Sequence, residues 1–232
     1  EPKYKKKSTQ CVFFSYILHR QKINSITIYV CLCFCYSKAL LPCKMKSALM
    51  ILAQGAEEME TVITVDMLRR AGVTVILAGL DGDSPVLCSR QVTLVPDKSL
   101  ENALSDQPTF DAVILPGGLE GSERLSKSEV VGNLLKTHEQ GGKIIAAICA
   151  APIAFVAHGV GKGKKVTSYP SMKGKISQDY EYVEGERVVV DGNVVTSRGP
   201  GTAYWFGLKL IEKLVSKEKA EEVEKGMIIS SY

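Results

Sequence analysis

Short, continuous apolar runs alternate with segments of helical periodicity along most of this chain. The runs at 48–52 (ALMIL), 112–115 (AVIL) and 143–148 (KIIAAI) are too short for typical helices and contain almost no polar side chains. Strands of a parallel sheet have this pattern because both of their faces are buried. Apolar residues at helical spacing follow at 59–68 and 129–140. The alternation predicts a doubly wound α/β sandwich, a mostly parallel sheet with helices on both faces.

The shorter patterns extend this architecture toward both ends of the domain. Gly72 ends the first helix, and residues 86–88 and 92–95 flank a Ser89-Arg90 link that predicts a small antiparallel ribbon. Further strands are expected at 73–78, 166–167, 182–183, 188–190 and 194–196, and further helices from Ser99, after Cys149, at 202–215 and at 217–225.

Cys149 lies between the run at 143–148 and a helix-like segment that opens with Ala150-Ala151-Pro152. A buried strand that turns sharply into a helix exposes the side chain at the corner and directs the first helical N–H groups toward it. These groups favour the thiolate, which is the nucleophilic and oxidisable form, so we expect the pKa of Cys149 to lie below the ordinary thiol value of about 8.5. The alternative is an inert buried cysteine, but the strand–cysteine–helix context favours a reactive residue.

Two other loops are expected beside Cys149, because sites in such sheets lie at the carboxyl ends of strands. The first is Gln54–Glu60, and the second is Pro116-Gly117-Gly118. The two glycines either supply backbone N–H groups to an oxyanion or form a tight turn that needs positive φ.

The sequence offers two kinds of partner for the thiol. The histidines of the domain, His138 and His158, fall at positions typical of surface or capping residues. The other candidate is a carboxyl group from Glu57, Glu58 or Glu60, since a protonated glutamate donates a hydrogen bond to sulfur. Alternatively, these acids form a solvated first helical turn that the helix dipole stabilises.

Residues 1–44 differ in composition from the rest. They hold eight basic residues and one acidic residue, a net charge of +7, whereas the remainder has 21 basic and 24 acidic residues, a net charge of −3. We expect 1–44 to be a leader outside the domain, either an upstream segment translated before a true start at Met45, a tail or a targeting segment, and 45–232 to be one domain. The apolar run at 26–36 is too short to span a membrane comfortably, and Cys31-x-Cys33-x-Cys35 lacks further ligands for a metal, so we expect no metal site.

The charge of the domain argues against a sequence-specific nucleic-acid-binding protein, and its few cysteines argue against a disulfide-stabilised one. A domain with a net negative charge lacks the excess of basic residues that sequence-specific nucleic-acid binding requires. Beyond residue 43 the chain has only Cys88 and Cys149, which is no disulfide framework and indicates a reducing compartment. We expect a cytoplasmic protein with mitochondrial and nuclear pools.

Five segments in order resemble the DJ-one (Parkinson disease protein seven, protein deglycase) family of the ThiJ/PfpI superfamily. They are LAQGAEEME at 52–60, CSR at 88–90, LPGG at 115–118, AAICA at 146–150 and TSRGPGT at 196–202. The resemblance implies a flavodoxin-like fold, a homodimer and a reactive cysteine at Cys149.

The resemblance also implies roles for individual residues. Glu60 matches the carboxyl group that hydrogen-bonds the thiol, and Gly117, Gly118 and Ala150 match backbone donors of the pocket. Arg70 and Arg90 match arginines near the interface and site, and Cys88 matches a secondary cysteine near the interface. Tyr169 stands where the family often has a histidine, and Val95 replaces a cysteine of some relatives. A neutral phenol is a poor base near pH 7, so we expect no peptidase activity.

Two functions of different class use these residues. The first is a cofactor-independent glyoxalase or deglycase, in which Cys149 attacks an α-oxoaldehyde such as methylglyoxal, or its early adduct on a protein or nucleotide group, and Glu60 transfers protons. The second is a redox-sensing, chaperone-like homodimer that is switched by oxidation of Cys149 to sulfinate. The sequence does not distinguish them.

Overall fold

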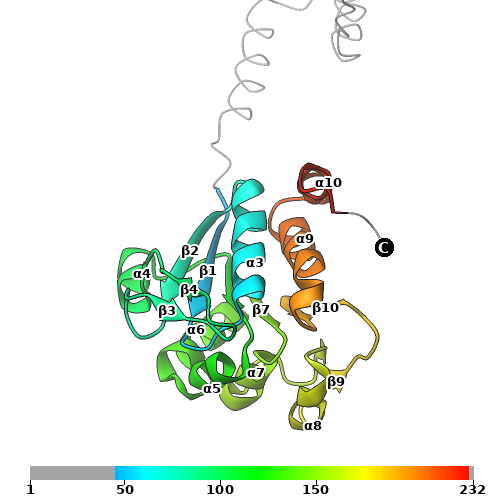
Figure 1. Cartoon of the computed structure of the whole chain (residues 1–232). Helices are drawn as coiled ribbons and strands as arrows, with labels where there is room; N and C mark the ends of the chain where they lie inside the picture. The colour runs from blue at the N-terminus through cyan, green and yellow to red at the C-terminus, as the bar shows by residue number, and fades with distance from the viewer. Residues whose placement is uncertain (1–44, 230–232) are drawn as a thin grey trace, which may run out of the picture. The chain divides into compact units, whose positions relative to one another are not determined.

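The structure is a computed structural model that describes residues 45–229, so the expected leader at 1–44 lies outside the described residues (Figure 1). Seven strands form the central sheet in the order β10-β11-β7-β6-β1-β2-β5. Their bounds are β1 (Ser47–Leu52), β2 (Thr74–Gly79), β5 (Lys98–Ser99), β6 (Ala112–Leu115), β7 (Ile144–Ile148), β10 (Val188–Asp191) and β11 (Val194–Ser197). Every neighbouring pair is parallel except β10 with β11. The predicted mostly parallel sheet is confirmed.

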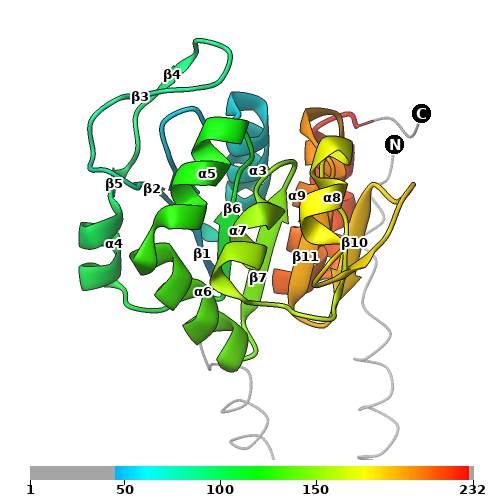
Figure 2. The ribbon, with the colours of Figure 1, turned by 90° about the horizontal axis from the view of Figure 1, so that it is seen from below.

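Helices cover both faces of this sheet (Figures 1 and 2). One layer contains α3 (Glu58–Arg70), α9 (Ala203–Leu214) and α10 (Lys217–Gly226), and the other contains α5 (Leu119–Lys127), α6 (Glu129–Gln140) and α7 (Pro152–His158). The short helix α4 (Leu100–Asp106) packs at the β2–β5 edge, and α8 (Lys173–Ile176) follows a 3-10 turn at Pro170–Met172. The core lies between the layers, where β1, β6 and β7 are buried almost throughout, as their apolar sequences predict.

Two small sheets complete the fold. The predicted ribbon is confirmed: β3 (Val86–Leu87) pairs antiparallel with β4 (Thr93–Leu94). The other pairs β8 (Lys165–Val166) with β9 (Glu181–Tyr182) in parallel. Helix α5 was not predicted, because its segment, LEGSERLSK, is short and largely polar and follows a glycine turn.

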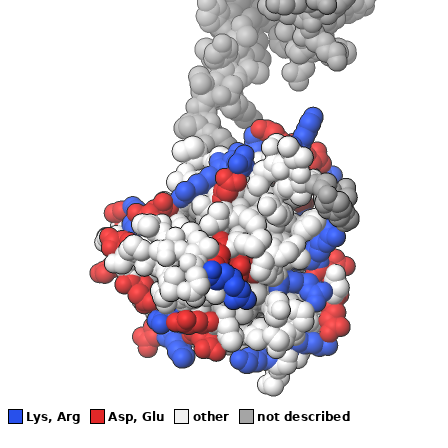
Figure 3. All heavy atoms as spheres, in the orientation of Figure 1, with Lys and Arg blue, Asp and Glu red and all other residues white. Residues whose placement is uncertain are grey.

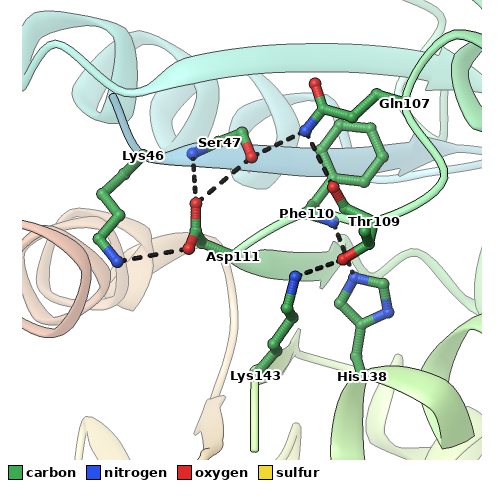
Figure 4. A network of polar contacts seen from close by, with 8 residues as sticks. All are labelled: Lys46, Ser47, Gln107, Thr109, Phe110, Asp111, His138 and Lys143. Atoms are coloured by element: carbon green, nitrogen blue, oxygen red, sulfur yellow. Dashed lines mark hydrogen bonds and ion pairs between the residues drawn. The ribbon is translucent and has the colours of Figure 1, made fainter. Parts of the chain in front are cut away.

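A polar network joins β1, β6 and β7 at their amino ends, opposite the carboxyl-end loops (Figure 4). Asp111, just before β6, accepts a hydrogen bond from the Ser47 N–H at 3.0 Å and pairs with Lys46 at 3.3 Å. Gln107 donates to the Ser47 hydroxyl at 2.9 Å, and Lys143 contacts the Thr109 hydroxyl. These contacts hold the strand ends in register.

His138 belongs to the same region but is not the surface residue that its sequence position indicated. The residue is only 1% exposed. Nε2 accepts the Phe110 N–H at 3.2 Å (Figure 4), and Nδ1 donates to the Leu134 carbonyl at 2.8 Å. Burial lowers the pKa of His138, so the neutral ring is the form that joins α6 to β6.

Candidate active site

Three loops meet at the carboxyl ends of neighbouring parallel strands. The loop after β1 leads into α3, Pro116-Gly117-Gly118 follows β6, and Cys149 follows β7. Because β1 pairs with β6 and β6 with β7, their carboxyl ends lie side by side. The Glu57 N–H donates to the Gly117 carbonyl at 3.0 Å, which joins the first loop to the second. The structure therefore brings these segments together at one edge, as the sequence predicts.

The backbone of Cys149 is strained and held on both sides. Its φ of 64° is in the left-handed region, which non-glycine residues rarely adopt. The Cys149 N–H donates to the Ser197 carbonyl at 3.0 Å, and the Cys149 carbonyl accepts the Tyr169 N–H at 2.8 Å. Such strain costs on the order of 1–3 kcal/mol and persists only where the surroundings fix it. The geometry is that of a nucleophile at a sharp strand-to-helix turn.

Glu60 is the fully buried acid of the site. It is 0% exposed, and its Oε2 accepts the Gly117 N–H at 2.8 Å. Its other oxygen, Oε1, has no hydrogen-bond partner that meets normal geometry among residues 45–229. Burial, with a smaller effect of the Glu57 charge, raises the pKa of Glu60 to about 8. Glu60 is therefore mostly protonated at neutral pH, and the acid proton belongs on the unpartnered oxygen.

Gly117 must be glycine for a packing reason. A Cβ at this position would lie 2.5 Å from the Cys149 Cβ and 2.6 Å from the Glu60 Oε2. The missing side chain thus brings the acid and the thiol together. The predicted role of Gly117 needs correction, however: its N–H is already bonded to Glu60, so it positions the acid and is not a free oxyanion donor.

The other two predicted donors do face the sulfur. The N–H groups of Gly118 and Ala150 both act to lower the pKa of the Cys149 thiol. Gly118 has a φ of 84°, so the tight-turn interpretation also holds for this glycine. The backbone donors of the site are therefore Gly118 and Ala150.

The expectation that Cys149 titrates below an ordinary thiol is wrong. Burial raises the pKa of Cys149 to about 12, and the Glu60 carboxylate adds to this effect. The Gly118 and Ala150 donors oppose the shift but do not overcome it. The helix that follows, α7, begins only at Pro152 and has 7 residues, so it offers little dipole to the sulfur.

The raised values of Glu60 and Cys149 belong to a coupled pair. The Cys149 thiol lowers the pKa of Glu60, whereas the charge of the Glu60 carboxylate raises the pKa of the thiol. Loss of one proton leaves a single negative charge that either the carboxylate or the sulfur carries. Proton transfer from the thiol to the Glu60 carboxylate therefore generates thiolate and acid without exposing two buried charges. This arrangement suits a thiol nucleophile with an adjacent general base.

The neighbouring glutamates are also buried, which corrects the alternative of a solvated first turn. Glu57 is 8% exposed and caps α3 through the Glu60 N–H at 2.8 Å. Glu58 is 6% exposed and accepts hydrogen bonds from the Ser89 hydroxyl and the Arg90 N–H. Glu58 thus ties the β3–β4 ribbon to the start of α3.

The other predicted residues, Arg90, Arg70 and Cys88, differ in how close they lie to Glu60 and Cys149. Arg90 lies at the rim, where its charge acts on Glu57. Arg70 is at the far end of α3 and pairs with Asp66 at 2.6 Å, so the structure does not bring it into the site. Cys88 is buried beside Leu52 and Ala56, burial raises its pKa to about 11, and its sulfur faces the Val86 carbonyl at 3.9 Å.

Neither histidine nor Tyr169 supplies a base to the thiol. His138 lies in the amino-end network, and His158 bonds the Leu125 carbonyl at 2.9 Å, as a capping residue does. The Tyr169 side chain is 47% exposed, and the contact that joins this residue to Cys149 is made by its backbone. Among residues 45–229, no group of three or more His, Cys, Asp or Glu is placed to hold a metal ion.

The segment after β11 is a part of the site for which no residue role was predicted. Ser197 pairs with Ile148 in the sheet, so Arg198 follows directly beside Cys149. The only sequence signal for this was that 196–202 is one of the segments that carry the family resemblance.

In the described part of the chain, no helix is both long and apolar enough to cross a membrane.

Comparison with known proteins agrees with this geometry. Residues 46–213 match the model of the DJ-1/PfpI family. The chain is 56% identical over 185 residues to Protein dj-1beta of Drosophila melanogaster, covering 80% of this chain and 98% of the relative. It is 39% identical over 187 residues to the glutathione-independent glyoxalase DJR-1.2 of Caenorhabditis elegans, covering 80% and 97%. The crystal structure of Drosophila melanogaster DJ-1beta superposes with a TM-score of 0.78 at 55% identity, over 81% of this chain and 100% of that one.

Proposed function

Because this chain belongs to the DJ-1/PfpI family, we propose that it protects against carbonyl stress as a cysteine-dependent glyoxalase. The observation that carries the proposal is the Glu60–Cys149 pair, a buried acid and thiol coupled at a strained strand-to-helix corner. A relative named a glutathione-independent glyoxalase, 39% identical over most of its length, supports the same chemistry.

The proposed reaction begins with thiol addition to the aldehyde of methylglyoxal. The Glu60 carboxylate accepts the thiol proton, the sulfur bonds to the aldehyde carbon, and the carbonyl oxygen is protonated to give a hemithioacetal. The N–H groups of Gly118 and Ala150, which face the sulfur, stabilise the oxygen while it carries charge.

The second half is an internal redox step. Glu60 removes the proton from the former aldehyde carbon and returns a proton to the neighbouring carbon, so the aldehyde carbon is oxidised while the ketone carbon is reduced. The product is a thioester of lactate, and water cleaves it to lactate and the free thiol. The electrons balance within the substrate, so we propose a reaction that needs no cofactor. The same addition to an early adduct on a protein or nucleotide group would make the chain a deglycase.

Lactate formation tests the proposal. Purified wild-type protein should convert methylglyoxal to lactate, and Cys149→Ser should lose at least about 100-fold of the rate because the hydroxyl is a far weaker nucleophile. The matched control is Cys88→Ala, which removes the other cysteine of the domain and should retain the rate. Equal lactate formation by wild type and Cys149→Ser would overturn the proposal.

A second function is favoured by the unpartnered Glu60 oxygen. Oxidation of the thiolate by one peroxide gives sulfenic acid and hydroxide, and a second peroxide gives sulfinic acid and water. A protonated Glu60 Oε1 and the N–H groups of Gly118 and Ala150 are donors that suit the two sulfinate oxygens. We propose this redox-sensing and chaperone-like role as the alternative.

A peroxide titration, combined with the lactate assay, separates the two functions. Mild peroxide followed by intact-protein mass spectrometry should give mainly sulfinate at Cys149 in wild type, and less sulfinate in Glu60→Leu, which loses the hydrogen bond. A sensor would show this behaviour without forming lactate. If wild type and Glu60→Leu oxidise alike, Glu60 has no part in stabilising sulfinate.

For the partner, we propose a second copy of the chain. Four apolar side chains on α3 and the β3–β4 ribbon are exposed, namely Met59, Val62, Leu87 and Val92. Glu58 bonds these two elements together, and we propose that their exposed apolar residues act as one surface, here called the α3–ribbon surface. Figure 3 shows uncharged atoms over much of this part of the molecule, with one cluster of charged side chains among them and others at the borders. A self-complementary apolar surface suits a homodimer with twofold symmetry.

Peptidase activity is not proposed, because both domain histidines bond elsewhere and Tyr169 is a weak base. The free thiols of Cys88 and Cys149 suit a reducing compartment, and we propose that the protein acts in the cytoplasm, with mitochondrial and nuclear pools.

A further inference from the structure

Glu57 is a buried acid that bonds to the two backbone segments that hold Glu60. Its Oε2 accepts the Glu60 N–H at 2.8 Å, and its own N–H donates to the Gly117 carbonyl at 3.0 Å. The Gly117 N–H in turn donates to the Glu60 Oε2 at 2.8 Å. Glu57 therefore holds both the backbone of the acid and the loop that fixes one of its oxygens.

The environment of Glu57 contains groups that oppose its charge and groups that favour it. Burial raises the pKa of Glu57, and the neighbouring Glu58 charge adds to this effect. The N–H groups of Glu60 and Met59 and the Arg90 charge act in the opposite direction. Because a carboxylate that accepts N–H groups keeps its charge more easily, Glu57 is an anion near pH 8, where Glu60 titrates.

The negative charge of Glu57 acts on the thiol through Glu60. It raises the pKa of Glu60, whereas the groups that shift the pKa of Cys149 are Glu60 and the backbone donors of the site. The same charge raises the pKa of Cys88, which remains a neutral thiol because burial brings that pKa to about 11. The titratable and charged groups around Glu57 are therefore Glu58, Arg90, Cys88 and the Glu60–Cys149 pair.

We propose that Glu57 is a positioning residue that sets the pH at which the Glu60–Cys149 pair releases its shared proton. As a cap it fixes the Glu60 backbone, and as a nearby negative charge it keeps the proton on the pair at neutral pH. The stored proton is then available to the substrate oxygen when the sulfur adds. The inference deepens the proposed glyoxalase function and rests on it for the use of that proton. The reacting atoms remain those of Glu60 and Cys149.

The test separates the charge of Glu57 from its bond to the helix. Glu57→Gln keeps an oxygen that accepts the Glu60 N–H but removes the charge, whereas Glu57→Asp keeps the charge and a good capping group. Glu57→Ser, which also caps a helix without a charge, takes the place of Glu57→Gln if that variant does not fold. Iodoacetamide is neutral and reacts with thiolate, so its rate of reaction with the Cys149 peptide is followed by mass spectrometry from pH 6 to pH 10 in the full chain.

We expect Glu57→Gln to move the midpoint of this profile to lower pH by about half a unit to one unit, as for one nearby charge in a partly screened site. Below the midpoint, the alkylation rate at a given pH should therefore rise by about threefold to tenfold. Glu57→Asp should stay within about 0.3 unit of wild type. The control is Glu129→Gln, which removes an exposed acid from the first turn of α6 and should leave the midpoint unchanged.

The same midpoint in wild type and Glu57→Gln would overturn the proposal, because a residue that only caps the helix would change stability and not the profile. An equal shift in Glu57→Asp would also overturn it, since the geometry of the cap and not the charge would then be responsible. The profile does not depend on turnover. A shifted midpoint in a protein that forms no lactate would keep the role of Glu57 and reject the glyoxalase function.

Discussion

The Gly117 N–H donates to the Oε2 of Glu60 at 2.8 Å, and the space left by the missing Gly117 side chain is occupied by that oxygen and the Cβ of Cys149. A single glycine therefore orients the acid and allows the thiol to approach it. This contact fixes which Glu60 oxygen is occupied and leaves Oε1 for the proton that the coupled pair shares.

Gly117→Ala should damage both the fold and the site. The new methyl group would lie 2.6 Å from Glu60 Oε2 and 3.0 Å from the Ile148 carbonyl oxygen, which is backbone and moves little. We expect a loss of about 2 kcal/mol or more in the free energy of unfolding and slower alkylation of Cys149. Chemical denaturation and thiol labelling measure the two effects. Gly174→Ala, where nothing lies within 4 Å, is the matched control and should be close to neutral.

Glu60→Gln should gain stability relative to wild type as the pH rises. The folded-state pKa of Glu60 is about 8, well above the value of about 4.3 in an unfolded chain. The folded state therefore binds the proton more tightly, and wild type loses stability between pH 5 and pH 8, because Glu60 is ionised in the unfolded chain over this range while the folded protein keeps the proton up to about pH 8.

Glutamine cannot ionise, so the difference in unfolding free energy, variant minus wild type, should rise by on the order of 2 kcal/mol or more over that range. Denaturation curves at pH 5, 6.5 and 8 provide the measurement. Glu129→Gln, at an exposed acid in the first turn of α6, serves as the control and should show no such trend. A difference that stays constant with pH would show that Glu60 is already ionised at pH 5.

His138 should make the fold sensitive to acid. Burial lowers its folded pKa below the unfolded value, and Lys143 adds a smaller effect of the same sign. Its contribution is complete above about pH 6.5 and is lost as the pH falls through the folded pKa, because the protonated ring can no longer accept the Phe110 N–H.

The stability advantage of wild type over His138→Gln should therefore shrink by about 1 kcal/mol or more between pH 7.5 and pH 5. Thermal or chemical unfolding at several pH values tests this, with the half-buried His158 changed in the same way for comparison. An advantage that grows on acidification would mean that the buried ring is charged.

Several elements could be predicted from the sequence because their signals are local. The apolar runs around Leu49 and Ile145 identify buried parallel strands, and Ser99 and Gly72 mark a helix start and end. The strand-to-helix corner at Cys149 was predictable for the same reason. The raised thiol pKa was not, because it depends on burial and on an acid 89 residues earlier in the chain. The direction of the Gly117 N–H and the burial of His138 also arise only when distant segments pack together.

The α3–ribbon surface should hold the dimer. Val62→Arg places a charge among the exposed apolar residues of this surface, and desolvating that charge opposes association. We expect light scattering at micromolar concentration to show a dimer for wild type and a monomer for Val62→Arg. Val130→Arg, an equally exposed valine on α6, should stay dimeric. Wild-type protein that is monomeric at this concentration would reject the homodimer.

The most direct test of the account is the pH profile of kcat/KM for lactate formation from methylglyoxal, in wild type and Glu60→Gln. The proton shared by Glu60 and Cys149 must leave before the sulfur attacks, so the wild-type profile should rise through about pH 8. Glu60→Gln should lose that step and at least about 100-fold of the rate, because no base remains beside the thiol. The same profile and rate in both proteins would contradict the claim that one shared proton controls this site.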